Sequence, residues 1–430
     1  MTKLTITALS HDGRGIGTID QKKIFIDYVL PDETILCEIK KKHHRYLEGR
    51  ASQIENTNAD RTIPLCPHFG ICGGCSLQHM KVEAQIAFKQ QTVIEQLSHF
   101  GKVSPLTILP PLVADTRGYR HKARLGVKYV NKKNKLIVGF REKNSRYLAD
   151  VSECHVLHSR VGMKLVLLRE LIASLSNYQH VPQVEVAIGD EDAALIFRHL
   201  TDFTETDLQH LINFGKENHF HIYTQPGPPS SIIKQWPSDQ HHRLHYSITD
   251  ENIRFQYHPL DFTQIHLPLN RLMIKQALTC LSLKPNDIVL DLFCGIGNFT
   301  LPIAKYAQYV IGIEGSKEMV ERAYENATLN QVHNIKFLFQ NLIVDDIEIT
   351  GLPIFNKILL DPPRTGAKEI LPFIGKKQVE KIVYISCNPA TLARDAHDLV
   401  HRYGYQLEKI GTIHMFPHTS HIEVMAIFVR

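Results

Sequence analysis

The spacing of hydrophobic and polar positions along this chain changes near residue 261. Beyond that point, short apolar runs alternate with longer stretches of helical periodicity. Strands are expected at Asp287–Leu292, Tyr309–Glu314, Asn334–Leu338, Lys357–Asp361 and Lys381–Ser386. Apolar strands that alternate with helices are typical of a parallel sheet covered by helices on both faces. Residues 261–430 are therefore predicted to form a doubly wound, Rossmann-like α/β domain.

The first 57 residues have a different pattern, in which short apolar stretches are separated by Gly and Asp. Strands are expected at Leu4–Leu9, Ile24–Val29 and Thr34–Ile39. Short strands at such spacing predict a small β-barrel over residues 1–57. The basic run Lys40–Arg45 has two interpretations, a phosphate-binding face or a solvated strand edge that lysines protect from aggregation.

Residues 58–260 have a mixed pattern. A cysteine-rich loop over residues 64–80 is followed by a helical pattern from Val82 to Phe100. Further along, strands are expected at Ala123–Val130 and Leu136–Phe140, and a helix at Met163–Leu175. The chain is thus predicted to contain three domains, 1–57, 58–260 and 261–430, of which the middle one is α+β.

Composition adds limits rather than an assignment. The 430 residues are 22% charged and 43% hydrophobic, with a net charge of +5, which is ordinary for a globular protein and permits a polyanionic partner. The pattern contains no secretory signal and no apolar run long enough to span a membrane. We therefore expect a cytoplasmic protein whose eight cysteines are ligands, nucleophiles or packing residues, not disulfides.

One cysteine occupies a position suited to chemistry. Cys387 follows the apolar run Lys381–Ser386 and precedes Asn388 and Pro389, so it is expected on a turn at the end of a buried strand. Open α/β sheets bind their ligands at the ends of strands. A buried structural thiol is the commoner fate of a cysteine, but the strand-end turn favours a nucleophile.

A glycine turn predicts the second substrate. Gly295 and Gly297 follow an apolar strand, but Thr300 stands where a dinucleotide fingerprint would have its third glycine. An acidic residue before the turn and Asn298 after it favour an S-adenosylmethionine site instead. Three polar residues at the ends of later strands support this interpretation: Glu314, Asn341 and Asp361.

A thiol at such a site suits methylation of a pyrimidine ring. Carbon 5 of uracil becomes nucleophilic when a thiolate adds at carbon 6, and a base must later remove the proton from carbon 5. Glu423, which enters the last apolar run, is the candidate base. A cytosine enzyme would carry a second cysteine beside Pro362, and an amino-group methyltransferase an aromatic residue in place of Arg364. Neither is present.

A second group of cysteines predicts a metal site. Cys66, Cys72 and Cys75 lie in a glycine-containing loop, with Cys154 as a distant fourth thiol. Four thiolates suit zinc or an iron–sulfur cluster. A single C-x2-C pair with two separate cysteines favours the cluster over zinc, and the spacing is not that of radical enzymes.

The chain also contains a basic segment. Residues 117–146 include eleven Lys and Arg residues and one Glu, with Tyr119, Tyr129 and Phe140 interleaved and Tyr147 directly after them. A solvated basic hairpin would explain the charge alone. The density of charge with aromatic residues favours a surface that binds RNA phosphates and stacks bases.

With these motifs in view, the chain resembles the RNA uracil-5-methyltransferase family over nearly its full length. The resembling segments are Cys66–His79, Asp291–Asn298, Leu360–Arg364, Ser386–Asp395 and Met415–Glu423. Within the family it is most similar to the bacterial branch that acts on 23S ribosomal RNA and has an N-terminal TRAM barrel and a 4Fe–4S cluster. The transfer-RNA branch lacks both.

The resemblance implies a class I methyltransferase domain and specific roles. Cys387 would be the nucleophile and Glu423 the base, with a 4Fe–4S cluster on Cys66, Cys72, Cys75 and Cys154. S-adenosylmethionine would be bound by Gln264, Phe293, Asn298, Glu314, Asn341 and Asp361. We expect a monomer that methylates carbon 5 of one uridine in 23S ribosomal RNA. The alternatives are a transfer-RNA uracil-5-methyltransferase and an iron–sulfur RNA-binding protein without turnover.

Overall fold

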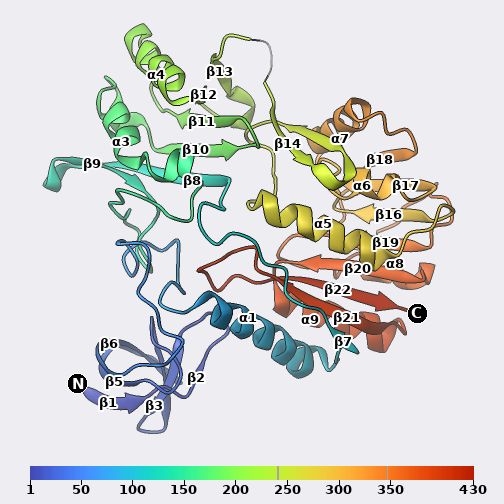
Figure 1. Cartoon of the computed structure of the whole chain (residues 1–430), viewed down its shortest axis with the longest axis horizontal. Coiled ribbons are helices and arrows are strands. Elements are labelled where there is room, and N and C mark those ends of the chain that lie inside the picture. Colours follow the sequence, from blue (N-terminus) through green and yellow to red (C-terminus); the bar gives the residue numbers. More distant parts are fainter. Residues whose placement is uncertain (240–241, 346) are drawn as a thin grey trace.

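The computed structural model describes residues 1–239, 242–345 and 347–430. Two six-stranded sheets and one eight-stranded sheet account for most of the strands. Figure 1 shows the N-terminal sheet below, the middle sheet above it and the eight-stranded sheet beside both. Among the described residues, no helix combines the length and the apolarity that crossing a membrane requires.

The N-terminal sheet has the strand order β1-β5-β6-β4-β3-β2. Its strands are β1 (Thr2–Thr5), β2 (Ala8–Leu9), β3 (Gly15–Ile19), β4 (Lys22–Ile26), β5 (Thr34–Lys42) and β6 (Tyr46–Asn56). The predicted strand Leu4–Leu9 is wrong as a continuous element, because the chain breaks between β1 and β2. Ile6, in that break, is fully buried and packs in the core of the sheet. β3 and β6 were not predicted.

The middle sheet has the order β13-β12-β11-β10-β8-β9. Its strands are β8 (Lys122–Val130), β9 (Lys135–Gly139), β10 (Gln183–Ile188), β11 (Ala193–Arg198), β12 (His221–Gln225) and β13 (Ile233–Trp236). The predicted strands at 123–130 and 136–140 correspond to β8 and β9, and the predicted helix at 163–175 to α3 (Leu165–Ala173). α3 and α4 (Glu205–Asn218) contribute to the core of this sheet.

The eight-stranded sheet has the order β18-β17-β16-β19-β20-β22-β21-β7. Five strands are mutually parallel: β16 (Ile288–Leu292), β17 (Tyr309–Glu314), β18 (Ile335–Phe339), β19 (Lys357–Leu360) and β20 (Lys381–Ser386). These confirm the predicted parallel α/β core. β22 (Glu423–Val429) runs antiparallel to β20, and β21 (Gln406–Ile413) antiparallel to β22. The sheet is therefore mixed at this side.

Helices cover both faces of the eight-stranded sheet. Buried residues of α5 (Leu267–Leu281), α6 (Thr300–Ala304) and α7 (Lys317–Leu329) share one core. Those of α8 (Leu371–Lys377) and α9 (Pro389–His397) share a second core on the other face. The hairpin of β14 (Leu244–Ile248) and β15 (Ile253–Tyr257) joins the first core and packs against α7.

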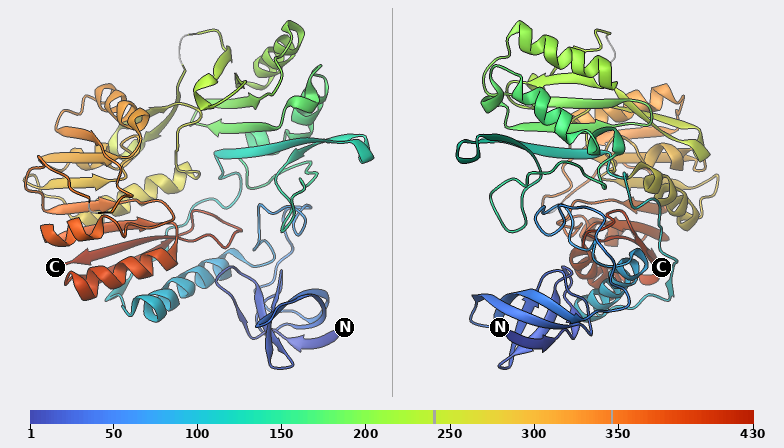
Figure 2. Two further views of the ribbon diagram at one scale, coloured as in Figure 1. Left: turned by 180° about the vertical axis from the view of Figure 1, so that it is seen from behind. Right: turned by 60° about the vertical axis from the view of Figure 1, so that its left-hand side comes forward.

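A segment from the middle of the chain also belongs to this sheet's surroundings. α1 (Val82–Gln96) continues into a π-helical turn, Leu97–Gly101, and Val93 and Leu97 pack into the second core. β7 (Thr107–Ile108) pairs in parallel with β21. Both views of Figure 2 and Figure 1 show α1 alongside α9. Residues 82–108 therefore pack with the eight-stranded sheet, although they lie far from it in sequence.

Candidate active site and cysteine loop

The glycine turn after β16 forms the floor of the candidate site. Phe293, Gly295 and Gly297 have φ angles of +64°, +54° and +90°, a backbone region that favours glycine. A Cβ added at Gly295 would meet nothing within 4 Å, so the backbone here is open to a ligand. The Glu314 carboxylate accepts the N–H groups of Gly295 and Ser316, both at 3.0 Å. Glu314 is thereby fixed at the mouth of the turn.

Asn298 has its side-chain amide engaged within the protein. Its Oδ1 accepts the Tyr246 hydroxyl and the Asn270 amide, each at 2.9 Å, and its Nδ2 donates to Asn270 Oδ1 at 3.0 Å. These bonds attach the glycine turn to α5 and β14. Sequence reasoning missed Asn270 and Tyr246, since nothing in their local pattern marks them.

Two further polar residues at strand ends have distinct surroundings. Asp291 is fully buried, and it accepts the Thr300 hydroxyl at 2.5 Å. Its burial raises the pKa of the carboxyl to about 8. Asn341, after β18, is exposed, and its Oδ1 accepts the Ile343 N–H at 3.0 Å.

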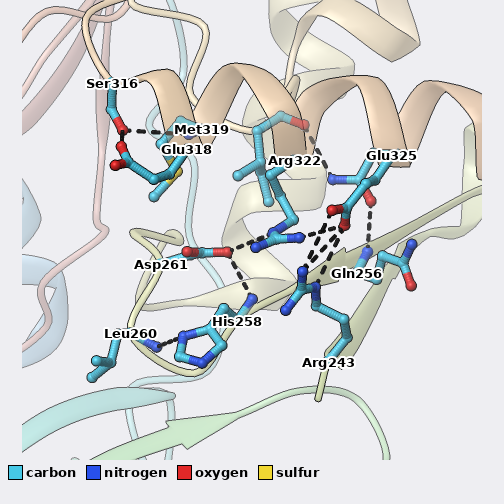
Figure 3. A network of polar contacts seen from close by, with 12 residues as sticks. Arg243, Gln256, His258, Leu260, Asp261, Ser316, Glu318, Met319, Arg322 and Glu325 are labelled. Carbon is cyan, nitrogen blue, oxygen red and sulfur yellow. Dashed lines mark hydrogen bonds and ion pairs between the residues drawn. The ribbon is translucent and has the colours of Figure 1, made fainter. Parts of the chain in front are cut away.

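The turn that carries Gln264 is held by the polar network in Figure 3. The Asp261 carboxylate accepts the His258 N–H at 2.7 Å and Arg322 Nε at 3.0 Å, and Arg322 also contacts Glu325. Lys122 of β8 donates to the Asp261 carbonyl. Gln264 is half-buried, and its amide has no partner among the residues described. The backbone of this turn is thus fixed, while the Gln264 amide remains available to bond a ligand.

Cys387 and Glu423 lie at the same edge of the sheet as these turns. Cys387 is half-buried and Glu423 is 4% exposed. Burial, together with the carboxylates of Glu423 and Asp361, raises the pKa of the Cys387 thiol to about 11, whereas Arg364 opposes this shift. Burial also raises the pKa of Asp361 to about 7 and that of Glu423 well above its usual range. The thiol and both carboxyl groups therefore interact electrostatically.

The helix after Cys387 holds the loop that carries Asp361. Asn388 caps α9 through the Ala390 N–H, and its Nδ2 donates to the Arg364 carbonyl at 3.0 Å. Buried Asp395 accepts the Ala367 N–H at 2.8 Å and the Tyr384 hydroxyl at 2.7 Å. Asp395 has a signal in the sequence, because it is an acidic residue on the apolar face of an amphipathic helix. This signal does not predict that its carboxylate bonds to the loop of Ala367.

The four predicted cysteine ligands line one cavity of about 1430 Å³. Burial, reinforced by the charges of neighbouring cysteines, raises the pKa of Cys72 to about 11. The same causes raise the pKa of Cys75 to about 12, although its hydrogen bond with Gln78 opposes the shift. In the described ranges, no three Cys, His, Asp or Glu side chains are arranged to hold a metal ion. A single zinc ion would require such an arrangement, because its Zn–S bonds of about 2.3 Å bring the sulfurs close together.

The same cavity reaches the basic segment and the loop ahead of Glu423. Its lining includes Thr419 and His421 at one end. Basic and aromatic residues of the predicted RNA surface line the rest: Arg120, Arg124, Lys128, Lys132, Lys133, Phe140, Arg141, Lys143, Arg146 and Tyr147. Arg124 and Lys143 also pair with Glu185 at 3.1 Å and Asp27 at 2.7 Å. A positively charged channel thus extends from the cysteines to the loop that precedes Glu423.

Named relatives match nearly the full length of this chain. The RlmD enzyme of Legionella pneumophila (strain Lens), named 23S rRNA (uracil(1939)-C(5))-methyltransferase, is 46% identical over 99% of this chain and 96% of its own length. The protein of the same name from Francisella tularensis subsp. holarctica (strain OSU18) is 47% identical over the same shares.

A solved structure matches the whole chain. The Pyrococcus abyssi tRNA (uracil-54, C5)-methyltransferase, in complex with S-adenosyl-L-homocysteine, has a TM-score of 0.74 and 22% identity, and the match covers 100% of both chains. This likeness shows a shared fold with a class I methyltransferase domain. The TRAM domain model matches residues 2–52, and the tRNA (uracil-5-)-methyltransferase family model matches residues 119–430. The chain therefore belongs to the tRNA (uracil-5-)-methyltransferase family.

Proposed function

We propose that this protein transfers a methyl group from S-adenosylmethionine to carbon 5 of one uridine in 23S ribosomal RNA. The target uridine is the equivalent of the one numbered 1939 in the names of its relatives. The observation that carries the proposal is the placement of a thiol and a buried carboxyl, Cys387 and Glu423, next to each other at the end of the β20–β22 strand pair.

The reaction follows from these two groups. The Cys387 thiolate adds to carbon 6 of uracil, and the electron pair displaced onto the ring makes carbon 5 a nucleophile. Carbon 5 takes the methyl group from the sulfonium, which leaves as a neutral thioether. The Glu423 carboxylate then accepts the proton from carbon 5, and the bond between carbon 6 and sulfur breaks to release the thiolate. The base must leave its stack to reach both groups.

The methyl donor would be held by the polar residues of the glycine turn and the neighbouring strand ends. We assign direct contacts to Gln264, Phe293, Glu314, Asn341 and Asp361. The open backbone at Gly295 and the fixed carboxylate of Glu314 support this assignment. Asn298, whose side-chain amide already bonds to Asn270 and Tyr246, would act mainly by shaping the turn.

The four cysteines would hold a 4Fe–4S cluster. Support comes from the donor set: Cys66, Cys72, Cys75 and Cys154 surround one cavity, and thiolates are the usual cluster ligands. Protein purified without oxygen is expected to contain about four iron and four sulfide per chain. One zinc per chain and no sulfide would contradict the cluster.

The remaining assignments concern domains and partners. We assign residues 1–57 to an RNA-binding TRAM barrel, 58–260 to a middle domain and 261–430 to the methyltransferase domain. Within 58–260, residues 82–108 and the β14–β15 hairpin pack with the methyltransferase sheet. The match of the TRAM model to residues 2–52 and the basic lining of the channel support RNA binding. The partner would be 23S ribosomal RNA, free or in an early assembly particle. The protein would act as a cytoplasmic monomer.

A covalent trap tests the function. Incubation with S-adenosylmethionine and a 23S RNA fragment that contains 5-fluorouridine should give an adduct stable to denaturing electrophoresis, because fluorine cannot leave as a proton. Cys387→Ala should give none. An equal adduct from Cys387→Ala, or none from the wild type, would contradict the mechanism.

Methyl transfer to different RNAs tests the substrate. The family model and the Pyrococcus abyssi structure carry transfer RNA in their names, so a transfer-RNA substrate is the main alternative. Transfer of label to 23S RNA and not to transfer RNA supports the proposal, and the reverse supports the alternative. Tight RNA binding without any methyl transfer would instead indicate an iron–sulfur RNA-binding protein.

A further inference from the structure

Two loops that are far apart in sequence meet beside the catalytic base. The cysteine loop, residues 64–80, carries three of the four cysteines of the channel. The base loop, residues 414–422, leads directly into β22 and Glu423. The N–H groups of Ser76 and Leu77 both donate to the His418 carbonyl at 2.9 Å. The position of the base loop is therefore tied to that of the cysteine loop.

One side chain bridges these loops from a third element. Gln85, on α1, is fully buried. Its Nε2 donates to the carbonyls of Leu77, at 3.1 Å, and Met80, at 2.8 Å, while its Oε1 accepts the His418 N–H at 2.8 Å. A single amide thus bonds to three buried backbone groups on two loops. The Leu77 carbonyl also accepts the Met80 N–H, but the Met80 carbonyl and the His418 N–H would be costly to leave unpaired.

The base loop needs such support at this point. His418 has a φ angle of +65°, which is sparsely populated by residues other than glycine and persists only where the surroundings hold it. Its backbone N–H and carbonyl are bonded to Gln85 and to the cysteine loop, and its Nε2 lies 3.1 Å from the Thr116 carbonyl. The strained residue stands five positions before Glu423.

α1 extends the support to the nucleophile. One turn after Gln85, the buried Lys89 ammonium donates to the Phe416 carbonyl at 2.8 Å. At the far end of this helical segment, Gly101 packs so closely on α9 that an added Cβ would lie 2.8 Å from the Ala393 carbonyl. The His397 ring of α9 contacts the Gly101 carbonyl at 3.0 Å. α1 therefore contacts both the base loop and the helix that follows Cys387.

We propose that Gln85 is a positioning residue for Glu423, through which the cysteine loop and α1 set the location of the base. This inference rests on the proposed function of Glu423. The side chain does not touch the reacting atoms; it fixes the loop that precedes them. A base must lie within hydrogen-bond reach of the proton it removes, and small misplacements slow the transfer strongly. Loss of Gln85 should therefore slow proton removal and leave the earlier addition step intact.

The test uses the full-length protein, S-adenosylmethionine and a 23S RNA fragment with ordinary uridine. Gln85→Met keeps the side-chain volume and removes the amide. We expect its turnover to fall about tenfold or more, with a methylated covalent protein–RNA adduct accumulating as the slow step becomes proton removal. Adduct formation with 5-fluorouridine RNA should remain within about twofold of wild type, because it does not require the base.

Gln91→Met is the matched control. Gln91 has the same side chain on the same helix, but this side chain is exposed and, within the described ranges, bonds only to Glu95, so wild-type turnover and no adduct are expected. If Gln85→Met lowers turnover and the fluorouridine adduct in parallel, or leaves turnover unchanged, the positioning role is wrong. Absence of the fluorouridine adduct in the wild type would instead refute the proposed function itself.

A milder variant keeps the test decisive if Gln85→Met fails to fold. Ser76 Oγ accepts the Ser420 N–H at 3.1 Å, which is a second bond between the two loops. Ser76→Ala removes only this half-buried acceptor and leaves Gln85 in place. A several-fold accumulation of the ordinary-uridine adduct, with an unchanged fluorouridine adduct, supports the coupling of the loops. A wild-type partition between adduct and product contradicts it.

Discussion

Cys387 directly follows β20, and Glu423 begins β22, the strand that pairs antiparallel with β20. The register of β20 and β22 ends with Ser386 opposite Val424, so the next position on one strand is Cys387 and the next on the other is Glu423. In the proposed mechanism, this arrangement would present the thiol and the carboxyl to one uracil ring without a long loop between them.

A change at Glu423 should separate the two halves of the reaction. Glu423→Gln retains the size of the side chain but cannot accept the proton from carbon 5. We expect turnover to fall by about 10²-fold or more, while the covalent adduct with ordinary uridine RNA accumulates. Denaturing electrophoresis with labelled RNA measures the adduct. Normal turnover of Glu423→Gln would remove Glu423 from the role of base.

The acidity of Cys387 should depend on the charge of the methyl donor. In the protein alone, burial and the nearby carboxylates raise the thiol pKa to about 11, so the thiol is neutral at physiological pH. A sulfonium nearby favours the thiolate, and S-adenosylmethionine should lower this pKa by about one unit or more. S-adenosylhomocysteine, whose sulfur is neutral, should not.

The measurement is the pH dependence of iodoacetamide labelling of the Cys387 peptide, followed by mass spectrometry. The other cysteines in the same digest serve as internal controls. An equal shift with both ligands would mean that binding alone, rather than charge, changes the thiol.

The parallel core was predictable because buried strands are continuous apolar runs, and the expected and observed limits of β16 to β20 differ by one residue at most. The antiparallel direction of β22 was not, because a strand buried on both faces has the same pattern in either direction. β3 (Gly15–Ile19) was missed because two of its five residues are glycine, which the pattern assigns to turns.

Within the site, residues next to a strand end were predictable and residues that act across the fold were not. Glu314 and Cys387 stand directly at the ends of β17 and β20. The bond between Gln85 and His418 joins positions 333 residues apart, and neither residue has a local motif. Such contacts depend on the topology, which one sequence does not reveal.

The network around Asp261 should be required for the site as well as for stability. Arg322→Leu leaves the Asp261 carboxylate, whose side chain is 12% exposed, without its cationic partner. We expect a loss of about 2–4 kcal/mol in the free energy of unfolding, and slower methyl transfer because the turn with Gln264 loosens. Chemical denaturation and initial rates at saturating substrates measure the two effects.

Arg254→Leu is the control for this change. Arg254 is exposed on β15, close in the fold to the same helix, and its side chain has no ion-pair partner in the described part of the chain. Near-wild-type stability and rate are expected. Equal effects of Arg254→Leu and Arg322→Leu would show that the loss of a charge, rather than of the Asp261 contact, is responsible.

Asp291 should make the protein less stable as the pH rises. Its carboxyl is fully buried, and its pKa is raised from 3.8 to about 8. The native state therefore retains a proton that the unfolded state releases. This contribution to stability is fully present below the unfolded pKa of 3.8 and is lost as the pH rises through about 8.

Asp291→Asn should remove this dependence, because the amide is neutral at every pH and still offers an oxygen to the Thr300 hydroxyl. Other groups titrate in both proteins, so the informative quantity is the difference in thermal midpoint between variant and wild type. At about pH 9 the variant should be more stable by about 1 kcal/mol or more, or about 2–4 °C. At about pH 5 this advantage should vanish or reverse, since the wild-type carboxyl is then protonated. A reversal would come from the new amide N–H groups. They would lie at the position of Oδ1, which is buried without a hydrogen-bond partner among the residues that the structure describes, and an unpaired buried N–H lowers stability. Differential scanning calorimetry across this range measures the difference, and parallel profiles for the two proteins would mean that Asp291 is not the titrating group.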